Sequence, residues 1–427
     1  MPTVESTIRM SIPEDGATLG ELEAAVGQAV EEAGRRLLLA ACGEMEEEVL
    51  IRLRRMRGRV QQVKVRPLDM LTRFGWIRLE RRQVVDREKG CYWCPLDDVL
   101  GLASRQHASP WVQQQAIALA TRIPYRQATA LLSGCLGTPL DHRTVYAWVQ
   151  QAGQAVVEEE DAQQEAVFED GEQPVSDPEL REIVVTEVDG TFVKAQREGS
   201  PNFEVRLGVL FSGKELGSAT AKHQRYRLKE RMLYGGVEPA EAFGERLFLA
   251  GEAKLGLSHA EHLLLVGDGA EWIEALAGHR RWQATYQLDW WHLAHNLHRA
   301  FPDRPALVSE LKRSLYSGDG DRLINLVSLA CLAGDGDPER VAQLETYLLA
   351  NRDGFYGARR LRKRLSPEAK LVAVEGSGAI EKQMDLAVGR RFKGQGMRWT
   401  RKGANRLLKL RLRELDKACP ERSRRAA

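Results

Sequence analysis

The sequence predicts an α/β protein made of several domains, in which a central α/β domain is interrupted by helices. Apolar runs of strand type alternate with helical patterns over residues 183–290. Residues 291–370 then have an almost wholly helical pattern. A chain of 427 residues is also too long for one ordinary hydrophobic core. We therefore expect smaller domains before the central one.

The N-terminal region, residues 1–58, is predicted to be helical. Apolar side chains recur at three- and four-residue spacing over residues 19–57, and the segment ends near a glycine. Such a helix provides a packing or dimerisation surface rather than chemistry.

A small β module is predicted over residues 59–108. Residues 59–65 and 73–85 alternate in polarity as strands do. The module carries a single CxxC pair, Cys91 and Cys94. A tetrahedral zinc site needs four ligands, so we do not expect Zn²⁺ there, and a hairpin turn or a ribbon that has lost its metal explains the pair.

A helix-turn-helix is predicted over residues 109–155. A Ser-Pro helix start at 109–110 and a second helix are followed by the break GTPLD and the helix HRTVYAWVQQAGQAV. In this motif the first residues of the last helix reach base edges. Those residues are Asp141, His142, Arg143, Thr144 and Tyr146. An ordinary helical hairpin is the alternative.

Charge is distributed unevenly along the chain, although the net charge is only +2. Residues 158–182 contain eleven acids and one arginine, and we interpret residues 156–182 as an acidic linker. Residues 382–413 contain eleven Lys or Arg and one acid. This basic block predicts phosphate contacts, with a solvated helix face as the alternative. The candidates are Arg390, Arg391, Lys393, Arg398, Arg401 and Lys402, with a weaker cluster at 222–231.

Three carboxylates are the candidate catalytic and metal-binding residues. Asp189 and Asp268 each close an apolar strand run, and Glu381 opens the basic helical stretch. If they meet at one edge of a sheet, they form an oxygen cage of the kind that Mg²⁺ prefers, with positions left for phosphate oxygens. The alternatives are Asp-Gly turns for the two aspartates, and Glu375 or Glu368 in place of Glu381.

The order of elements indicates an RNase H-like core with an all-α insertion. Three strands, a helix, a strand, a helix and a strand precede the helical segment and the last glutamate. We expect the first part of the core at 183–290, the insertion at 291–370, the last part at 371–416 and a disordered tail at 417–427. The GDGD repeats in the insertion lack EF-hand spacing, which predicts loops with N-capping aspartates.

The chain resembles bacterial insertion-sequence transposases of the DDE class, and is most similar to the Kra-type and Lre-type group, which is related to Mutator-like transposases. The matching motifs are VDGT at 188–191, GDGAEWI at 267–273, LDWWH at 288–292, SGAIE at 377–381 and GRRFKGQGMRW at 389–399. The resemblance covers about residues 60–415. It implies Asp189, Asp268 and Glu381 as the catalytic residues, and Asp289 and His292 as a D-x-x-H pair that orders the site.

The resemblance also implies cofactors and partners. Two Mg²⁺ ions, for which Mn²⁺ can substitute, would support cleavage and strand transfer on double-stranded DNA. The DNA would comprise the transposon ends and the target, and a homodimer or higher oligomer is expected because two ends must be joined. The alternatives are a nuclease or resolvase without strand transfer, and an inactive DNA-binding regulator. Trp290 and Trp291 suit either a core or a base-stacking role.

A membrane location is not expected. Apolar runs stay well below the roughly 20 residues that span a bilayer, and the N-terminus lacks the blocks of a signal peptide. We expect a cytoplasmic bacterial protein that is associated with the nucleoid when it is bound to DNA.

Overall fold

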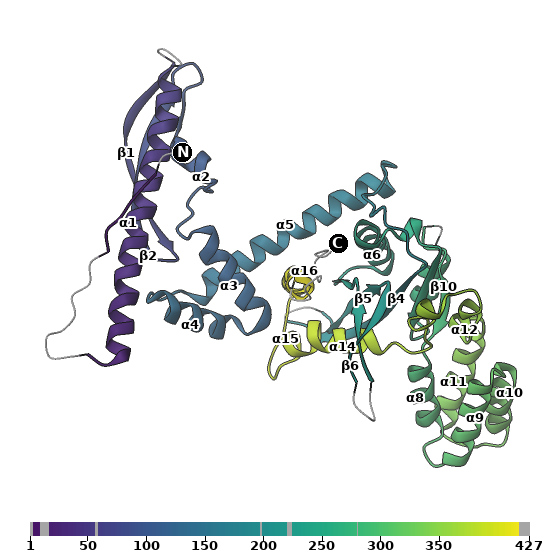
Figure 1. Ribbon diagram of the computed structural model, residues 1–427. Coiled ribbons are helices and arrows are strands. Elements are labelled where there is room, and N and C mark those ends of the chain that lie inside the picture. Colours follow the sequence, from purple (N-terminus) through teal and green to yellow (C-terminus); the bar gives the residue numbers. More distant parts are fainter. Residues whose placement is uncertain are drawn as a thin grey trace. The chain divides into compact units, whose positions relative to one another are not determined.

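The computed structural model describes residues 3–8, 17–55, 59–196, 199–219, 224–279 and 281–417 (Figure 1). The chain divides into two compact units, an N-terminal unit, Met1–Trp148, and a C-terminal unit, Val149–Ala427. The tail that we expect to be disordered, residues 417–427, lies outside the described residues except for Lys417. In the described part of the chain, no helix has both the length and the apolar character needed to cross a membrane.

The N-terminal unit begins with a long helix packed on a β hairpin. The helix starts at a capping box, in which the side chains of Thr18 and Glu21 accept each other's backbone N–H. A third strand pairs with the second strand of the hairpin. The elements are α1 (Leu19–Arg54), β1 (Val60–Thr72), β2 (Gly75–Asp86), β3 (Cys91–Trp93) and α2 (Pro95–Leu100). Their core contains Cys42, Leu68, Met70, Ile77, Leu79 and Leu96.

Three helices follow, where the helix-turn-helix is predicted. They are α3 (Pro110–Arg122), α4 (Tyr125–Leu136) and α5 (His142–Phe168). The first part of the expected acidic linker is therefore helical, because α5 continues to Phe168. The sequence DAQQEAVF at 161–168 is rich in Ala, Gln and Glu, which favour helix, and this composition outweighs the run of charge.

A mixed sheet lies at the centre of the C-terminal unit. Its strands are β4 (Ile183–Lys194), β5 (Asn202–Phe211), β8 (Met232–Gly236), β9 (His262–Gly267) and β10 (Thr285–Leu288), and their spatial order is β8-β5-β4-β9-β10. β5 is antiparallel to both of its neighbours, whereas β9 and β10 run parallel to β4. A separate ribbon is formed by β6 (Gly213–Ala219) and β7 (Gln224–Lys229).

Helices cover both faces of this sheet. On one face, α6 (Ala240–Leu255) and α7 (Glu271–Gly278), joined to β9 and β10 by short connections that include η1 (Leu257–His259), enclose an apolar core. On the other face, α14 (Gly378–Met384) packs against β4 and β5, and α16 (Arg401–Lys417) packs against β8. The candidate site lies on the α14 face.

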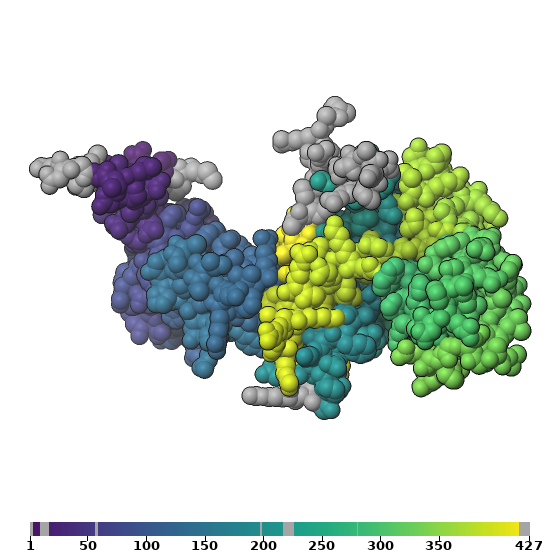
Figure 2. Space-filling view, turned by 90° about the horizontal axis from the view of Figure 1, so that it is seen from below, coloured from purple at the N-terminus to yellow at the C-terminus, as the bar shows by residue number. Residues whose placement is uncertain are grey.

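The helical insertion has a core of its own, and Figure 2 shows much of it as a green lobe. Asp319 and Asp337 of the GDGD repeats accept hydrogen bonds from Arg322 N and Arg340 N, which confirms the prediction of N-capping aspartates. The helices are α8 (Trp290–Ala300), α9 (Pro305–Ser317), α10 (Gly320–Leu332), α11 (Pro338–Ala350), η2 (Arg352–Gly354), α12 (Gly357–Arg362) and α13 (Pro367–Lys370).

The sequence suggested one continuous basic helix after Glu381, but in the structure this helix is interrupted. After α14 come a π-helical turn, η3 (Asp385–Gly389), and the short α15 (Arg390–Phe392). The chain then leaves the helix, with Gly396 at φ +74°, and Trp399 N–H donates to Lys194 O at 3.0 Å before α16 begins. The interruption arises because the KGQG sequence has two glycines, which disfavour helix.

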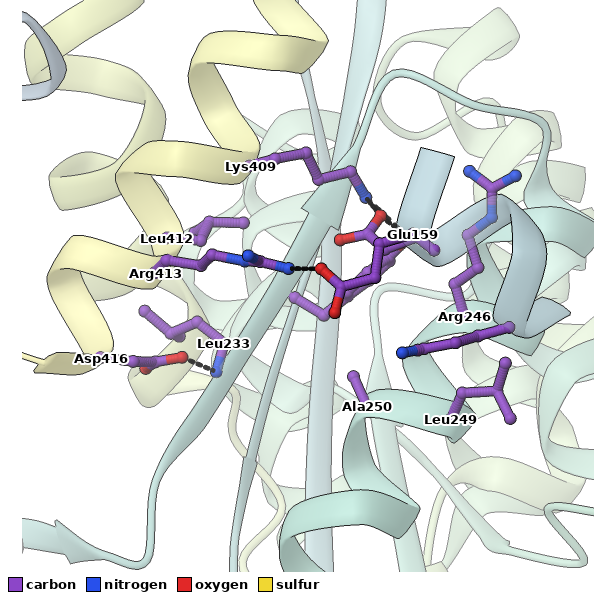
Figure 3. A pocket seen from close by; sticks show the side chains of 12 residues that line it. Glu159, Leu233, Arg246, Leu249, Ala250, Lys409, Leu412, Arg413 and Asp416 are labelled. Carbon is purple, nitrogen blue, oxygen red and sulfur yellow. Dashed lines mark hydrogen bonds and ion pairs between the residues drawn. The ribbon is translucent and has the colours of Figure 1, made fainter. Parts of the chain in front are cut away.

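Part of α16 is neutralised by the acidic run of α5, as Figure 3 shows. The buried Lys409 contacts Glu160 at 2.7 Å, and Arg413 contacts Glu159 at 2.7 Å. These pairs border a cavity of about 180 Å³ between α5, α6, β8 and α16, whose walls are both charged and apolar. Charges that are far apart in the sequence therefore meet, and this part of the basic block is used within the fold.

Candidate functional site

Three aspartates lie side by side where β9 and β10 end next to β4. Glu187 pairs with Val266, and Gly267 pairs with Leu288. Continuing this register places Asp189, Asp268 and Asp289 at neighbouring positions on β4 and after β9 and β10. Because paired residues of parallel strands share a face, the three side chains emerge on the α14 face. This row is the centre of the candidate site.

Asp189 has an electrostatic environment that favours its neutral form. Burial raises its pKa to about 6, and the negative charges of Asp268 and Asp289 act in the same direction. The backbone N–H of Gly190, at 2.7 Å, and the nearby His292 oppose this rise. A cation placed between Asp189 and Asp268 would relieve their mutual repulsion.

The loop that carries Asp268 is held by the helical insertion. Tyr347 of α11 donates its hydroxyl hydrogen bond to Asp268 O at 2.7 Å, and the buried Asn351 donates to Gly269 O at 3.4 Å. Gly269 has φ +94°, and a Cβ atom there would lie 2.5 Å from the Tyr347 ring. Glycine is therefore required at this turn, and the insertion sets the position of the Asp268 backbone.

Asp289 is buried and fully engaged in hydrogen bonds. Its Oδ1 accepts from Trp291 N at 2.9 Å and Ser377 N at 3.3 Å, and its Oδ2 accepts from His292 Nδ1 at 2.7 Å and from the Ser377 hydroxyl. Burial would lower the pKa of His292, but the hydrogen bond and the negative charge of Asp289 raise it. These contacts leave Asp289 little capacity to bind a metal ion, and they join the end of β10 to the segment before α14.

Glu187 is a site residue that the sequence reasoning missed. It points from β4 to the same face as Asp189, is 1% exposed, and its Oε2 accepts hydrogen bonds from Ala379 N at 2.9 Å and Ile380 N at 2.8 Å. Burial raises its pKa to about 7, although these hydrogen bonds act in the opposite direction. The sequence signal that could have identified it is an acidic residue inside the apolar run IVVTEV.

Glu381 lies one residue beyond this anchor, on α14, and is exposed. Among the residues that the structure describes, no group of three or more His, Cys, Asp or Glu side chains is arranged to hold a metal ion. The structure thus brings Asp189 and Asp268 together and leaves Glu381 on the adjoining helix. Of the alternatives, Glu375 pairs with Arg359 and Arg362, and Glu368 is exposed on α13.

Of the residues predicted to reach DNA bases, Asp141 directly precedes α5 and accepts a hydrogen bond from Arg143 N at 2.7 Å, and the others lie at the start of the helix. Arg143, Thr144 and Tyr146 are exposed and His142 is partly exposed, whereas Val145 is buried. The Tyr146 ring packs against Tyr125 of α4 in a T-shaped contact, with ring centroids 5.5 Å apart. The start of α5 therefore presents a polar face, while its apolar face packs within the N-terminal unit.

The predicted phosphate-contacting residues fall into two groups. Arg390, Lys393, Arg398, Arg401 and Lys402 are exposed, and Lys393 donates to the Thr191 hydroxyl, two residues along β4 from Asp189. Arg391 differs, because it is 1% exposed and its guanidinium lies 5.0 Å from the centre of the Trp399 ring. Because Arg391 is buried, the prediction that it contacts DNA phosphates is corrected, and its side chain instead packs within the fold.

The cysteine pair of the β module is split between surface and interior. Cys91 is exposed on β3, and Cys94 is buried at the start of α2. Burial raises the pKa of the Cys94 thiol.

Fold and site together define a mixed α/β protein with a row of carboxylates on β4 and directly after the parallel strands β9 and β10. The model of the family described as "Uncharacterised protein family (UPF0236)" matches residues 12–423, and the chain belongs to this family.

Two further comparisons give more distant similarities. A protein of Streptococcus gallolyticus, described as "UPF0236 protein in vanSb 3'region", is 24% identical over 379 residues, which is 87% of this chain and 77% of that protein. The solved "Drosophila P element transposase strand transfer complex" is 15% identical with a TM-score of 0.24, over 74% of this chain and 80% of that chain. A TM-score of this size does not by itself establish a shared fold.

Proposed function

We propose that this chain is a DDE-type DNA transposase of the Kra-type and Lre-type group, which binds the terminal repeats of an insertion sequence and cuts and joins DNA. The observation that carries the proposal is that Asp189 of β4 and Asp268, which directly follows the adjacent parallel strand β9, occupy neighbouring positions beside the helix that bears Glu381. Carboxylates in this setting suit phosphodiester chemistry with hard cations.

The sheet supports an RNase H-like core as part of the proposal. Numbered along the chain without the β6–β7 ribbon, its strands are arranged 3-2-1-4-5, and the second is antiparallel to the others. The insertion lies between the fifth strand and α14, where the sequence predicts an interruption before the last acidic residue.

The donor set fits Mg²⁺ or Mn²⁺. Asp189 and Asp268 supply only oxygen ligands, and each has one carboxylate oxygen that accepts a single local backbone N–H. Bound divalent ions would stabilise charge on the attacking and leaving oxygens of the phosphodiester. Glu381 would complete the ligand set, while Glu187 and Asp289 hold the segment that carries it.

DNA would be bound by surfaces of both units, each considered by itself. In the N-terminal unit, α3, α4 and α5 suit a helix-turn-helix with Arg143, Thr144 and Tyr146 on the reading face. In the C-terminal unit, Lys393, Arg398, Arg401 and Lys402 provide exposed charge for phosphates. A homodimer or larger assembly would bring two DNA ends together.

DNA cleavage and joining test the proposal. The substrate is DNA that carries the sequences flanking the coding region, in Mg²⁺, in Mn²⁺ or in EDTA. We expect metal-dependent joining that falls by roughly a hundredfold or more in Asp189→Asn, Asp268→Asn and Glu381→Gln. Glu368→Gln, a change at an exposed glutamate of α13, should leave activity unchanged. Joining that survives EDTA or Asp268→Asn would contradict the proposal.

A further inference from the structure

A cavity of about 460 Å³ opens beside the candidate site, between α8, α9 and the segment before α14. Its walls include Trp290, Trp291, Lys312, Tyr316, Glu375 and Gly376. Trp290 directly follows Asp289, and Gly376 directly precedes Ser377, whose hydroxyl binds Asp289. The cavity therefore adjoins the row of aspartates, and its size falls within the roughly 300–1,000 Å³ of small-ligand pockets.

The two tryptophans of the cavity have different environments. Trp290 is fixed, because its Nε1–H donates to Phe355 O at 2.9 Å and the Arg359 guanidinium lies 4.6 Å from its ring centre. Trp291 is 55% exposed, and its ring stacks on the His295 ring at 5.7 Å with an interplanar angle of 5°. The His292 ring lies roughly perpendicular to it at 4.9 Å, and the rest of the half-exposed Trp291 side chain is an apolar aromatic surface open to solvent.

The electrostatics of the cavity favour a ligand with negative charge. Glu375 is neutralised by Arg359, at 3.1 Å, and by Arg362. Lys312 is partly exposed, and within the described part of the chain no carboxylate lies at ion-pair distance from it. A planar group with an attached anion matches a stacking surface beside a free ammonium group.

We infer that this cavity is a subsite for one unpaired nucleobase of the DNA strand processed at the aspartates. The base stacks on Trp291 beside Tyr316, and Lys312 contacts a phosphate of the same strand. The inference rests on the proposed function, because it takes DNA as the substrate. Every base has a π face, so the subsite accepts bases without reading their sequence.

Binding of single-stranded DNA in EDTA tests the subsite without any chemistry. The probes are a fluorescein-labelled oligothymidylate and an oligonucleotide of the same length and charge in which the bases are replaced by abasic sites. Fluorescence anisotropy with the full-length protein gives both affinities. We expect Trp291→Ala to weaken binding of the oligothymidylate by roughly tenfold and to leave binding of the abasic strand unchanged. Trp291→Phe, which keeps an aromatic face, should retain most of the affinity.

Two further variants complete the design. Lys312→Ala should weaken both probes to a similar extent, because it removes a phosphate contact. Trp76→Ala, which removes a tryptophan that is 49% exposed on β2, is the matched control and should bind both probes as the wild type does. Equal losses for both probes in Trp291→Ala, or no loss, would overturn the inference. Because EDTA excludes metal-dependent cleavage, a preference for bases that depends on Trp291 would stand even if the protein failed to cut DNA.

Discussion

Glu187 and Ile380 are joined by a hydrogen bond of 2.8 Å between a buried carboxylate of β4 and the backbone N–H of the first turn of α14. A second bond of 2.9 Å joins the same oxygen to Ala379 N. The strand that carries Asp189 is thereby fastened to the helix that carries Glu381. Glu187, which is not one of the proposed catalytic residues, thus connects two parts of the chain that are distant in the sequence.

Replacing Glu187 should destabilise the C-terminal unit. Glu187→Ala leaves two backbone N–H groups without an acceptor in the interior, which costs about 1–3 kcal/mol of unfolding free energy. Glu187→Gln keeps one acceptor oxygen and should lose less. Urea denaturation measures both values. Glu215→Ala, at an exposed position of β6, is the control and should stay within about 0.5 kcal/mol of the wild type. Equal stability of Glu187→Ala and the control would contradict the anchoring role.

Tyr347→Phe tests whether the insertion positions Asp268. The change removes the hydroxyl that donates to Asp268 O, so we expect a loss of about 1 kcal/mol in stability and a roughly tenfold slower DNA cleavage. Tyr356→Phe removes a comparable hydroxyl, which donates to Leu315 O at 3.1 Å within the insertion. It should lose similar stability but cleave DNA at the normal rate. If both variants cleave equally fast, the insertion does not position Asp268.

Glu230→Gln should change how stability depends on pH. Burial would raise the pKa of Glu230, but hydrogen bonds from Arg181 and Ser212 and the charge of Arg181 lower it below its ordinary value of 4.5. A lowered pKa means that Glu230 stabilises the fold above about pH 4.5 and that this stabilisation is lost as the pH falls through the folded-state pKa.

The Glu230→Gln variant should therefore be less stable than the wild type by about 1–2 kcal/mol near neutral pH, and this difference should shrink as the pH falls below about 4.5. Urea denaturation at a series of pH values gives the difference directly. A difference that stays constant across the series would show that the charge of Glu230 does not matter.

Arg143→Ala tests the reading face of α5. Arg143 is exposed near the start of this helix, so its loss should weaken binding to the specific DNA end by about 1–3 kcal/mol and should affect unrelated DNA less. Arg36→Ala on α1, where the arginine side chain is 65% exposed, is the matched control. Competition binding measures the ratio of specific to non-specific affinity. An unchanged ratio would show that Arg143 does not take part in sequence-specific DNA recognition.

Local patterns predicted the features that depend on neighbouring residues. Asp319 and Asp337 cap helices as expected, because capping involves residues only three positions apart. Asp189 and Asp268 lie at adjacent strand positions because the apolar runs before them become neighbouring parallel strands. The glycines of KGQG could also have been interpreted as a helix break, since their effect is local.

Long-range contacts explain the rest. The burial of Arg391 depends on Trp399, which returns beside Lys194 only after the chain folds back. The acidic run of α5 suggested a solvated linker, yet Glu160 pairs with Lys409 almost 250 residues further along the chain. The role of Glu187 depends on α14, which is nearly 200 residues away. No spacing rule within one segment contains this information.

The most direct test of the central claim is the anomalous scattering of Mn²⁺ in a crystal of the wild-type protein bound to DNA. The account predicts peaks beside the carboxylates of Asp189 and Asp268, with Glu381 as a further ligand and metal–oxygen distances of roughly 2.0–2.2 Å. These peaks should be absent from the Asp268→Asn variant. Mn²⁺ bound elsewhere, with none beside Asp189 and Asp268 while the protein still cuts DNA, would contradict the account.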